Sequence, residues 1–172
     1  MANEPLTFNF AGDGNVPNNP TLPVLLYRGA VDVAAARDPE IAIEQLFMAN
    51  GWGHGLWRDG IFPYLHFHSA THEALGIARG TARVRLGGTR GEEVELKAGD
   101  VVVLPAGTGH QRLSGGTGLS VIGGYPGNSR YDLLRGGQGE HDRLLETIVQ
   151  VPLPDSDPLF GADGPLLTLW KP

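Results

Sequence analysis

Short apolar runs separated by glycine-containing turns recur along all 172 residues of the chain. Many short runs with turn signals between them are typical of proteins built mainly from β-strands. The dipeptides Gly87-Gly88, Ala98-Gly99 and Gly115-Gly116 mark three such turns. The pattern predicts strands at Thr7–Phe10, Val24–Tyr27, Phe62–His68, Glu73–Ala78, Ala82–Leu86, Glu92–Leu96, Asp100–Leu104, His110–Leu113, Leu119–Gly123 and Leu166–Trp170.

Two segments have the period of a helix instead. Asp38 can cap a helix that starts at Pro39 and ends near Asn50-Gly51, because proline suits the first turn and glycine the C-terminal cap. A second helix is predicted from about Glu140 to Val149, where apolar residues follow one face. We expect both helices to pack outside the sheets. Segment 12–23, rich in Gly, Asn and Pro, is predicted to be an ordered surface loop.

Composition narrows the class of protein. The net charge is −6, from 13 basic and 19 acidic residues, and no basic stripe is present, so nucleic acid is not an expected partner. No apolar run approaches the length of a membrane span, and the N-terminus lacks the features of a signal peptide. The absence of cysteine excludes disulfides and thiol chemistry. We expect a cytoplasmic protein with no membrane association.

Four side chains in two short stretches have the spacing of metal ligands. His66 and His68 are two residues apart, which places both imidazoles on one face of a β-strand. Glu73 follows after a four-residue break, and His110 lies in the second stretch. Imidazoles with a carboxylate form a mixed nitrogen and oxygen site that suits a divalent transition metal.

The alternation of a strand indicates which neighbours point into the same space. Leu75 and Ile77 share a face with Glu73 and look like core residues, so Glu73 should point inward and His72 should not. By the same rule Tyr64 shares a face with His66.

Both stretches resemble the two sequence motifs of the cupin superfamily. The first resembles the pattern G-x5-H-x-H-x4-E-x6-G at Gly60, His66, His68, Glu73 and Gly80. The second resembles G-x5-P-x-G-x2-H-x3-N at Gly99, Pro105, Gly107 and His110, with Ser114 where the family usually has Asn. Segments 12–30 and 152–170 are similar to those that flank the motifs in a group of uncharacterised bacterial cupins.

The resemblance implies a mainly β fold, an antiparallel β-barrel of the double-stranded β-helix or jelly-roll type with two or so short peripheral helices. We expect a single domain over residues 1–172, with the barrel core at about 60–125 and both terminal extensions packed on it. The resemblance also implies that His66, His68, Glu73 and His110 bind one divalent metal. Fe, Mn, Ni, Zn, Co and Cu all suit these ligands.

The leading functional hypothesis is a metal-dependent enzyme acting on a small organic molecule, most plausibly a dioxygenase, in which Glu73 serves as general base. The alternatives are an isomerase of a sugar or keto acid, or a non-catalytic binding or sensor protein, because the fold does not choose the chemistry. The His72 ring is a rival metal ligand, and His54 is interpreted as a surface histidine.

Two residues are predicted to contact the substrate. Arg112 shares a strand face with His110 and could bind a carboxylate, although an ion pair within the protein is an equal alternative. Tyr64 could donate a hydrogen bond to the ligand or simply pack. Apolar residues of the N-terminal segment and of PLLTLW at residues 165–170 have no place in a minimal barrel, so we also expect a homodimer.

Overall fold

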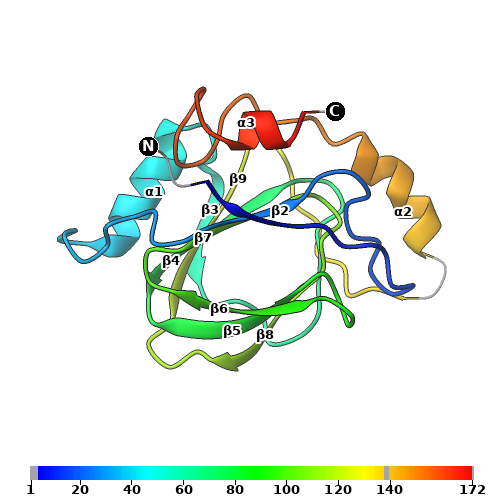
Figure 1. Cartoon of the computed structure of the whole chain (residues 1–172), viewed down its shortest axis with the longest axis horizontal. Helices are drawn as coiled ribbons and strands as arrows, with labels where there is room; N and C mark the ends of the chain where they lie inside the picture. Colours follow the sequence, from blue (N-terminus) through cyan, green and yellow to red (C-terminus); the bar gives the residue numbers. More distant parts are fainter. Residues whose placement is uncertain (1–3, 138–139, 172) are drawn as a thin grey trace.

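The computed structural model describes residues 4–137 and 140–171. Within them, two antiparallel sheets face each other (Figure 1). Their strands are β1 (Leu6–Phe8), β2 (Val24–Tyr27), β3 (His54–Asp59), β4 (Glu73–Arg79), β5 (Thr81–Leu86), β6 (Glu92–Lys97), β7 (Val101–Leu104), β8 (His110–Gly115) and β9 (Ser120–Tyr125). One sheet has the order β1-β2-β7-β4-β9-β3 and the other the order β6-β5-β8. The predicted mainly β jelly roll is confirmed.

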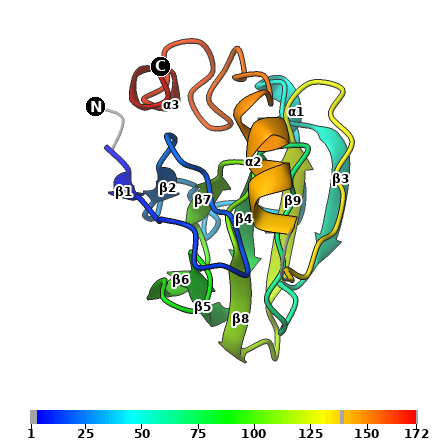
Figure 2. The ribbon, with the colours of Figure 1, turned by 90° about the vertical axis from the view of Figure 1, so that its right-hand side faces the viewer.

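The middle of the six-stranded sheet is covered on both faces, which explains why β2 and β7 are continuous apolar runs. In β2, Val24 and Leu26 pack between the two sheets, whereas Leu25 and Tyr27 pack on the outer side. The inner cluster also holds Leu75 and Ile77 of β4, as strand alternation predicted. In Figure 2 the three-stranded sheet lies at the bottom, and α1 and α3, described next, lie at the top.

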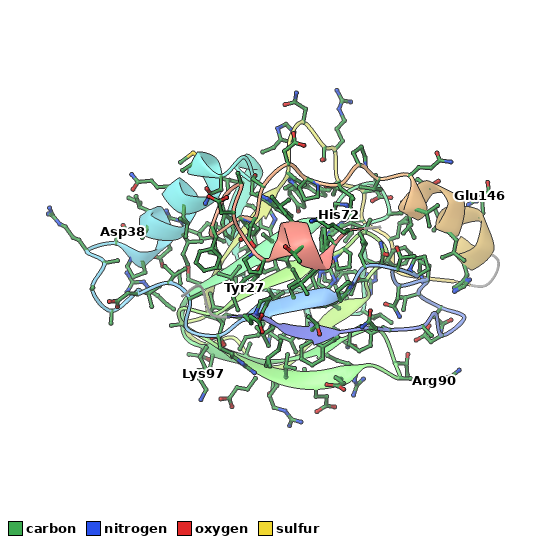
Figure 3. The ribbon with its side chains drawn as sticks, turned by 45° about the horizontal axis from the view of Figure 1, so that its top comes forward. Tyr27, Asp38, His72, Arg90, Lys97 and Glu146 are labelled. Carbon is green, nitrogen blue, oxygen red and sulfur yellow. The ribbon has the colours of Figure 1, made fainter. Side chains whose placement is uncertain are left out.

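Helix α1 (Pro39–Ala49) covers the outer face and follows the predicted capping. Asp38, labelled at its start in Figure 3, accepts a hydrogen bond from the backbone N–H of Ile41 at 2.9 Å. The helix packs closely on β4, because a Cβ added at Gly76 would lie 2.6 Å from Ile43 Cγ2. Helix α2 (Glu140–Val149) is also present at the predicted position.

The predicted strand at Leu166–Trp170 is wrong, because this segment forms the short helix α3 (Leu166–Leu169). A helix places Leu166 and Trp170 on one face, and both are buried against the outer face of the large sheet. The Trp170 Nε1–H donates to the carbonyl of Pro23 at 2.9 Å. Part of the apolar C-terminal segment therefore has a place within its own chain, and the homodimer stays a prediction.

Two other expectations about local structure need correction, and one strand was missed. The segment predicted as a strand at Phe62–His68 forms only isolated bridges, His66 with His110 and Phe67 with Leu134. Strand β3 was not predicted, because its sequence HGLWRD has a single apolar pair and its pairing with β9 contains a register shift. Loop 12–23 is partly buried rather than confined to the surface.

In the part of the chain that the structure describes, no helix is long and apolar enough to span a membrane.

The C-terminal segment is held to the sheet by the fully buried carboxylate of Asp157. This carboxylate accepts hydrogen bonds from the Tyr27 hydroxyl at 2.5 Å and from the backbone N–H groups of Leu159, Phe160 and Leu166 at 2.8, 3.1 and 3.1 Å. Removing the carboxylate would leave four buried or half-buried donors without a hydrogen-bond partner, which costs free energy away from water.

We therefore expect Asp157→Ala to lower the free energy of unfolding by about 3 kcal/mol. The matched control is Asp155→Ala, two residues earlier and exposed, which should change the free energy of unfolding by less than about 0.5 kcal/mol. Urea denaturation of both variants measures the difference. Equal stabilities would show that Asp157 does not fasten the C-terminal segment.

Candidate metal centre

Three buried histidines lie close together. His66 and His68 come from the extended segment before β4, and His110 is the first residue of β8. The backbone N–H of His66 donates to the His110 carbonyl at 3.1 Å, and the reverse bond is 2.9 Å long. One ring nitrogen from each histidine lies within 4.8 Å of the other two. The cluster is consistent with a metal site.

A hydrogen bond to a backbone carbonyl orients each of the three rings. The Nδ1 atoms of His66 and His110 lie 3.0 Å from the carbonyl oxygens of Tyr64 and Thr108, and Nδ1 of His68 contacts the carbonyl of Asp132. A carbonyl oxygen only accepts, so each Nδ1 carries a hydrogen. In a neutral imidazole, Nε2 then has its lone pair free, which is the tautomer that binds a metal.

The carboxylate of Glu73 closes the cluster from β4. Its Oε2 atom is 3.2 Å from Nε2 of His68 and 3.4 Å from Nε2 of His110. This oxygen is buried and finds no hydrogen-bond donor among the described residues. Three lone-pair atoms at such distances repel one another unless a proton or a cation lies between them. The donor set therefore fits a divalent transition metal.

In the metal-free protein a proton takes that place. Burial by itself lowers the pKa of His68, but the adjacent Glu73 carboxylate outweighs it and raises the pKa to about 9. Burial raises the pKa of Glu73, and the neighbouring His68 and His110 reverse this and hold it well below its usual range. Burial and the nearby His110 lower the pKa of His66 to about 3, so its ring stays neutral.

His72 lies outside the cluster, as strand alternation predicted. Figure 3 shows it beside α3, and its ring packs 4.8 Å from that of Trp170. Nδ1 accepts a hydrogen bond from the backbone N–H of Ala106 at 3.0 Å, and Nε2 lies 3.2 Å from the Pro152 carbonyl. Burial lowers the pKa of His72 to about 4, so the ring is a neutral structural group.

A chain of hydrogen bonds, which the sequence did not predict, holds the other oxygen of Glu73. The Tyr125 hydroxyl donates to Oε1 at 3.1 Å, and Trp57 Nε1–H donates to the same hydroxyl at 3.0 Å. Continuing the alternation of β9 from the core residue Val121 through Gly123 would have placed Tyr125 on the inner face. Alternation could not have predicted the contact of the Asp132 carbonyl with His68, because the loop that holds Asp132 has no regular period.

The cluster forms the floor of a pocket of about 300 Å³. Besides the three histidines and Glu73, the pocket is lined by Trp57, Arg58, Asp59, Gly60, Ile61, Phe62, Leu75, Tyr125, Tyr131 and Leu133. Trp57 is therefore a wall of the pocket. Trp52, by contrast, is a core residue whose Nε1–H donates to the Ser156 carbonyl at 2.8 Å.

The two predicted substrate-binding residues do not line this pocket. Arg112 pairs with Val84 and so lies on the inner face, but its guanidinium donates to the carbonyls of Ile61 at 3.0 Å and Gly115 at 2.7 Å. The Tyr64 ring stacks on Phe62 with 4.8 Å between centroids and meets the His66 ring edge-on at 5.7 Å, and the Tyr64 carbonyl orients His66. Strand alternation predicted the face on which these side chains lie, but not which groups their polar ends contact.

Comparison with known proteins agrees with this architecture. A family model described as "Cupin domain" matches residues 58–118. The chain is 38% identical over 170 residues to "Uncharacterized protein YjlB" of Bacillus subtilis (strain 168), and the match covers 99% of each sequence. The chain therefore belongs to the cupin family, and the predicted resemblance is confirmed.

Two solved structures show partial similarity. An oxalate decarboxylase of Lactobacillus farciminis is 23% identical with a TM-score of 0.38, covering 57% of this chain and 33% of its own. A salicylate 1,2-dioxygenase of Pseudoaminobacter salicylatoxidans is 15% identical with a TM-score of 0.32, covering 45% and 22%. The chain spans a third or less of these two chains. Such likenesses carry nothing about activity.

The first prediction from this geometry concerns metal content. His68→Ala should remove most of the bound metal, whereas His54→Ala, an exposed histidine on β3, should leave it unchanged. Metal that binds only the folded state adds about 3–4 kcal/mol at a few hundred times its dissociation constant. Chelation should therefore lower the melting temperature of the wild type and of His54→Ala, but not of His68→Ala. Equal metal content in the two variants would contradict the assignment.

A second prediction concerns the support of Glu73. Tyr125→Phe removes the donor to Oε1 while keeping the ring, so metal affinity should fall about 10–100-fold, the usual effect of losing such an outer hydrogen bond. Tyr131→Phe is the matched control, because its ring stacks on Tyr125 at 4.9 Å without bonding Glu73. Competition with a fluorescent chelator measures both affinities. A loss in the control as large as in Tyr125→Phe would refute the role of the hydroxyl.

A third prediction concerns pH. The metal must displace the proton of His68, whose pKa the Glu73 carboxylate raises to about 9. Metal affinity should therefore rise about tenfold per pH unit from pH 6.5 toward pH 9 and then level off. Conversely, in the metal-free protein the stabilisation from the His68–Glu73 pair is full between pH 4.5 and pH 6.5, the ordinary pKa values of the two groups. It is lost as pH rises through the His68 pKa of about 9, and in acid as pH falls through the lowered pKa of Glu73. Calorimetric titration in buffers of different ionisation enthalpy counts the released proton. A flat affinity over this range would contradict the paired state.

Proposed function

We propose that this protein is a metal-dependent enzyme that acts on a small organic molecule and that its reaction is a dioxygenation. The observation that carries the proposal is the contact of the buried Glu73 Oε2 with the Nε2 atoms of His68 and His110. With His66, these groups would hold the metal at the floor of the pocket. Four protein ligands leave room in the coordination sphere of a six-coordinate ion, as a catalytic site requires.

The walls of the pocket favour this reaction over isomerisation of a sugar. A sugar presents many hydroxyl groups, and each would need a polar partner in the site. Above the metal ligands, the walls are instead largely aromatic and aliphatic, with Trp57, Phe62 and Leu133 among them. A site of this kind suits an apolar substrate and dioxygen, which itself carries no charge.

The chain's own residues can move one proton. Among the described residues that line the pocket, Glu73 is the one buried carboxylate, and the Tyr125 hydroxyl keeps it in place through Oε1. Oε2 is then the atom that would accept a proton from a substrate hydroxyl when Glu73 loosens from the metal. The bound metal would supply a Lewis acid for the substrate oxygens and, if redox-active, an electron path between substrate and dioxygen.

The test combines metal analysis with oxygen uptake. Protein purified without added metal is analysed for bound ions, reloaded with each candidate ion, and mixed with a panel of enols and phenols that carry two adjacent oxygens. Dioxygenation predicts oxygen uptake equal to substrate consumed, lost in Glu73→Gln and retained in His54→Ala. Substrate conversion without oxygen uptake would favour an isomerase, and tight binding without turnover would favour a sensor or binding protein.

A further inference from the structure

The pocket has few charged groups on its walls. Arg58 and Asp59 are the charged residues that line it apart from the ligand cluster, and both are exposed. The Arg58 guanidinium is occupied by Glu44, whose Oε1 accepts from Nε at 3.1 Å and from Nη2 at 3.0 Å. Asp59 Oδ1 accepts from the backbone N–H of Gly60 at 2.8 Å. The one cation among the described wall residues is therefore already neutralised.

Two further arginines near the pocket are also held elsewhere. Arg112 donates to two backbone carbonyls, those of Ile61 and Gly115. The guanidinium carbon of Arg135 lies 3.6 Å from the centroid of the Tyr64 ring, on which it makes a cation–π contact. Neither lines the pocket. A second anionic group on a ligand would lose part of its water here and meet no unpaired cation among the described residues that line the pocket.

The walls instead offer flat apolar surface. Phe62 meets the His66 ring edge-on at 5.2 Å, and Tyr131 stacks on Tyr125. Phe62, Tyr131 and Leu133 keep 42%, 54% and 44% of their surface exposed, although all three line the pocket. Large side chains left uncovered around a hollow are typical of a binding site.

We infer that the site takes a compact molecule with a flat apolar body and one chelating pair of oxygens, and with no second acidic group. The volume of about 300 Å³ is at the low end for ligand pockets, roughly 300–1,000 Å³, and so favours a single ring with its substituents. The oxygens would bind the metal held by the cluster, and the ring would lie between Phe62, Leu133 and Tyr131. The inference rests on the proposed metal site, and it separates this protein from one that recognises small dicarboxylates.

Three hydroxamates that share one chelating group test the inference. Acetohydroxamate carries only a methyl group, benzohydroxamate carries a phenyl ring, and 4-carboxybenzohydroxamate adds an acid to that ring. Calorimetry with the metal-loaded protein should show benzohydroxamate binding at least ~10-fold tighter than acetohydroxamate, because the ring leaves water for the apolar wall. The added carboxylate should weaken binding at least ~10-fold relative to benzohydroxamate, because it finds no free cation.

Paired variants locate the preference in this pocket. Phe62→Ala should reduce the ratio of benzohydroxamate to acetohydroxamate affinity, whereas Phe160→Ala, an exposed phenylalanine outside the pocket, should leave the ratio unchanged. Leu133→Ala with Leu153→Ala as its control forms a second pair, since these leucines are 44% and 43% exposed and only Leu133 lines this pocket. All four changes are at exposed positions, so folding should survive them.

The possible outcomes test the substrate class and the metal site separately. If the metal binds but the ring gives no advantage, or the added carboxylate tightens binding, the substrate class is wrong and the metal site stands. Tighter binding of the carboxylate would mean that Arg58 leaves Glu44 to bind an anion. If no metal binds at all, the proposed function fails and this inference fails with it.

Discussion

The contact between Glu73 Oε2 and the Nε2 atoms of His68 and His110 is the constraint on which the rest of the site depends. A buried carboxylate beside two nitrogen lone pairs is unstable alone, so a positive charge must lie among them. Each surrounding group keeps this arrangement from relaxing. Backbone carbonyls hold the far side of each imidazole, and the Tyr125 hydroxyl holds the far oxygen of the carboxylate.

The barrel makes this arrangement rigid by bringing distant segments together. Glu73 starts β4, which lies between β7 and β9 near the middle of the large sheet and is covered on both faces. Gly107 passes between the His68 carbonyl, to which it donates at 2.7 Å, and the Asn18 carbonyl, which would lie 2.7 Å from an added Cβ. Its φ of +92° also favours glycine. Asn18 in turn accepts from Gly109 N–H at 3.0 Å, beside His110.

Local signals predicted local features well. The capping residue Asp38 and Gly51 placed α1, and strand alternation separated Glu73 from His72. The sequence LLTLW at residues 166–170 fits the period of a strand as well as that of a helix. The helix forms because it packs on the outer face of the large sheet, a contact that the local sequence does not predict. Likewise Arg112 lies on the predicted face, but carbonyls contributed by other parts of the fold take its guanidinium. Contacts between distant segments, including Tyr125 with Glu73 and Asp132 with His68, depend on the assembled barrel.

X-ray absorption spectroscopy of the metal-loaded protein is the sharpest test of this site, because it counts the ligands around the ion. We expect three imidazole nitrogens and one carboxylate oxygen from the protein at about 2.0–2.2 Å. His72→Gln should leave the imidazole count at three, and His110→Gln should reduce it to two. A spectrum with no imidazole ligand, or one that loses an imidazole in His72→Gln and none in His110→Gln, would show that this cluster does not hold the metal.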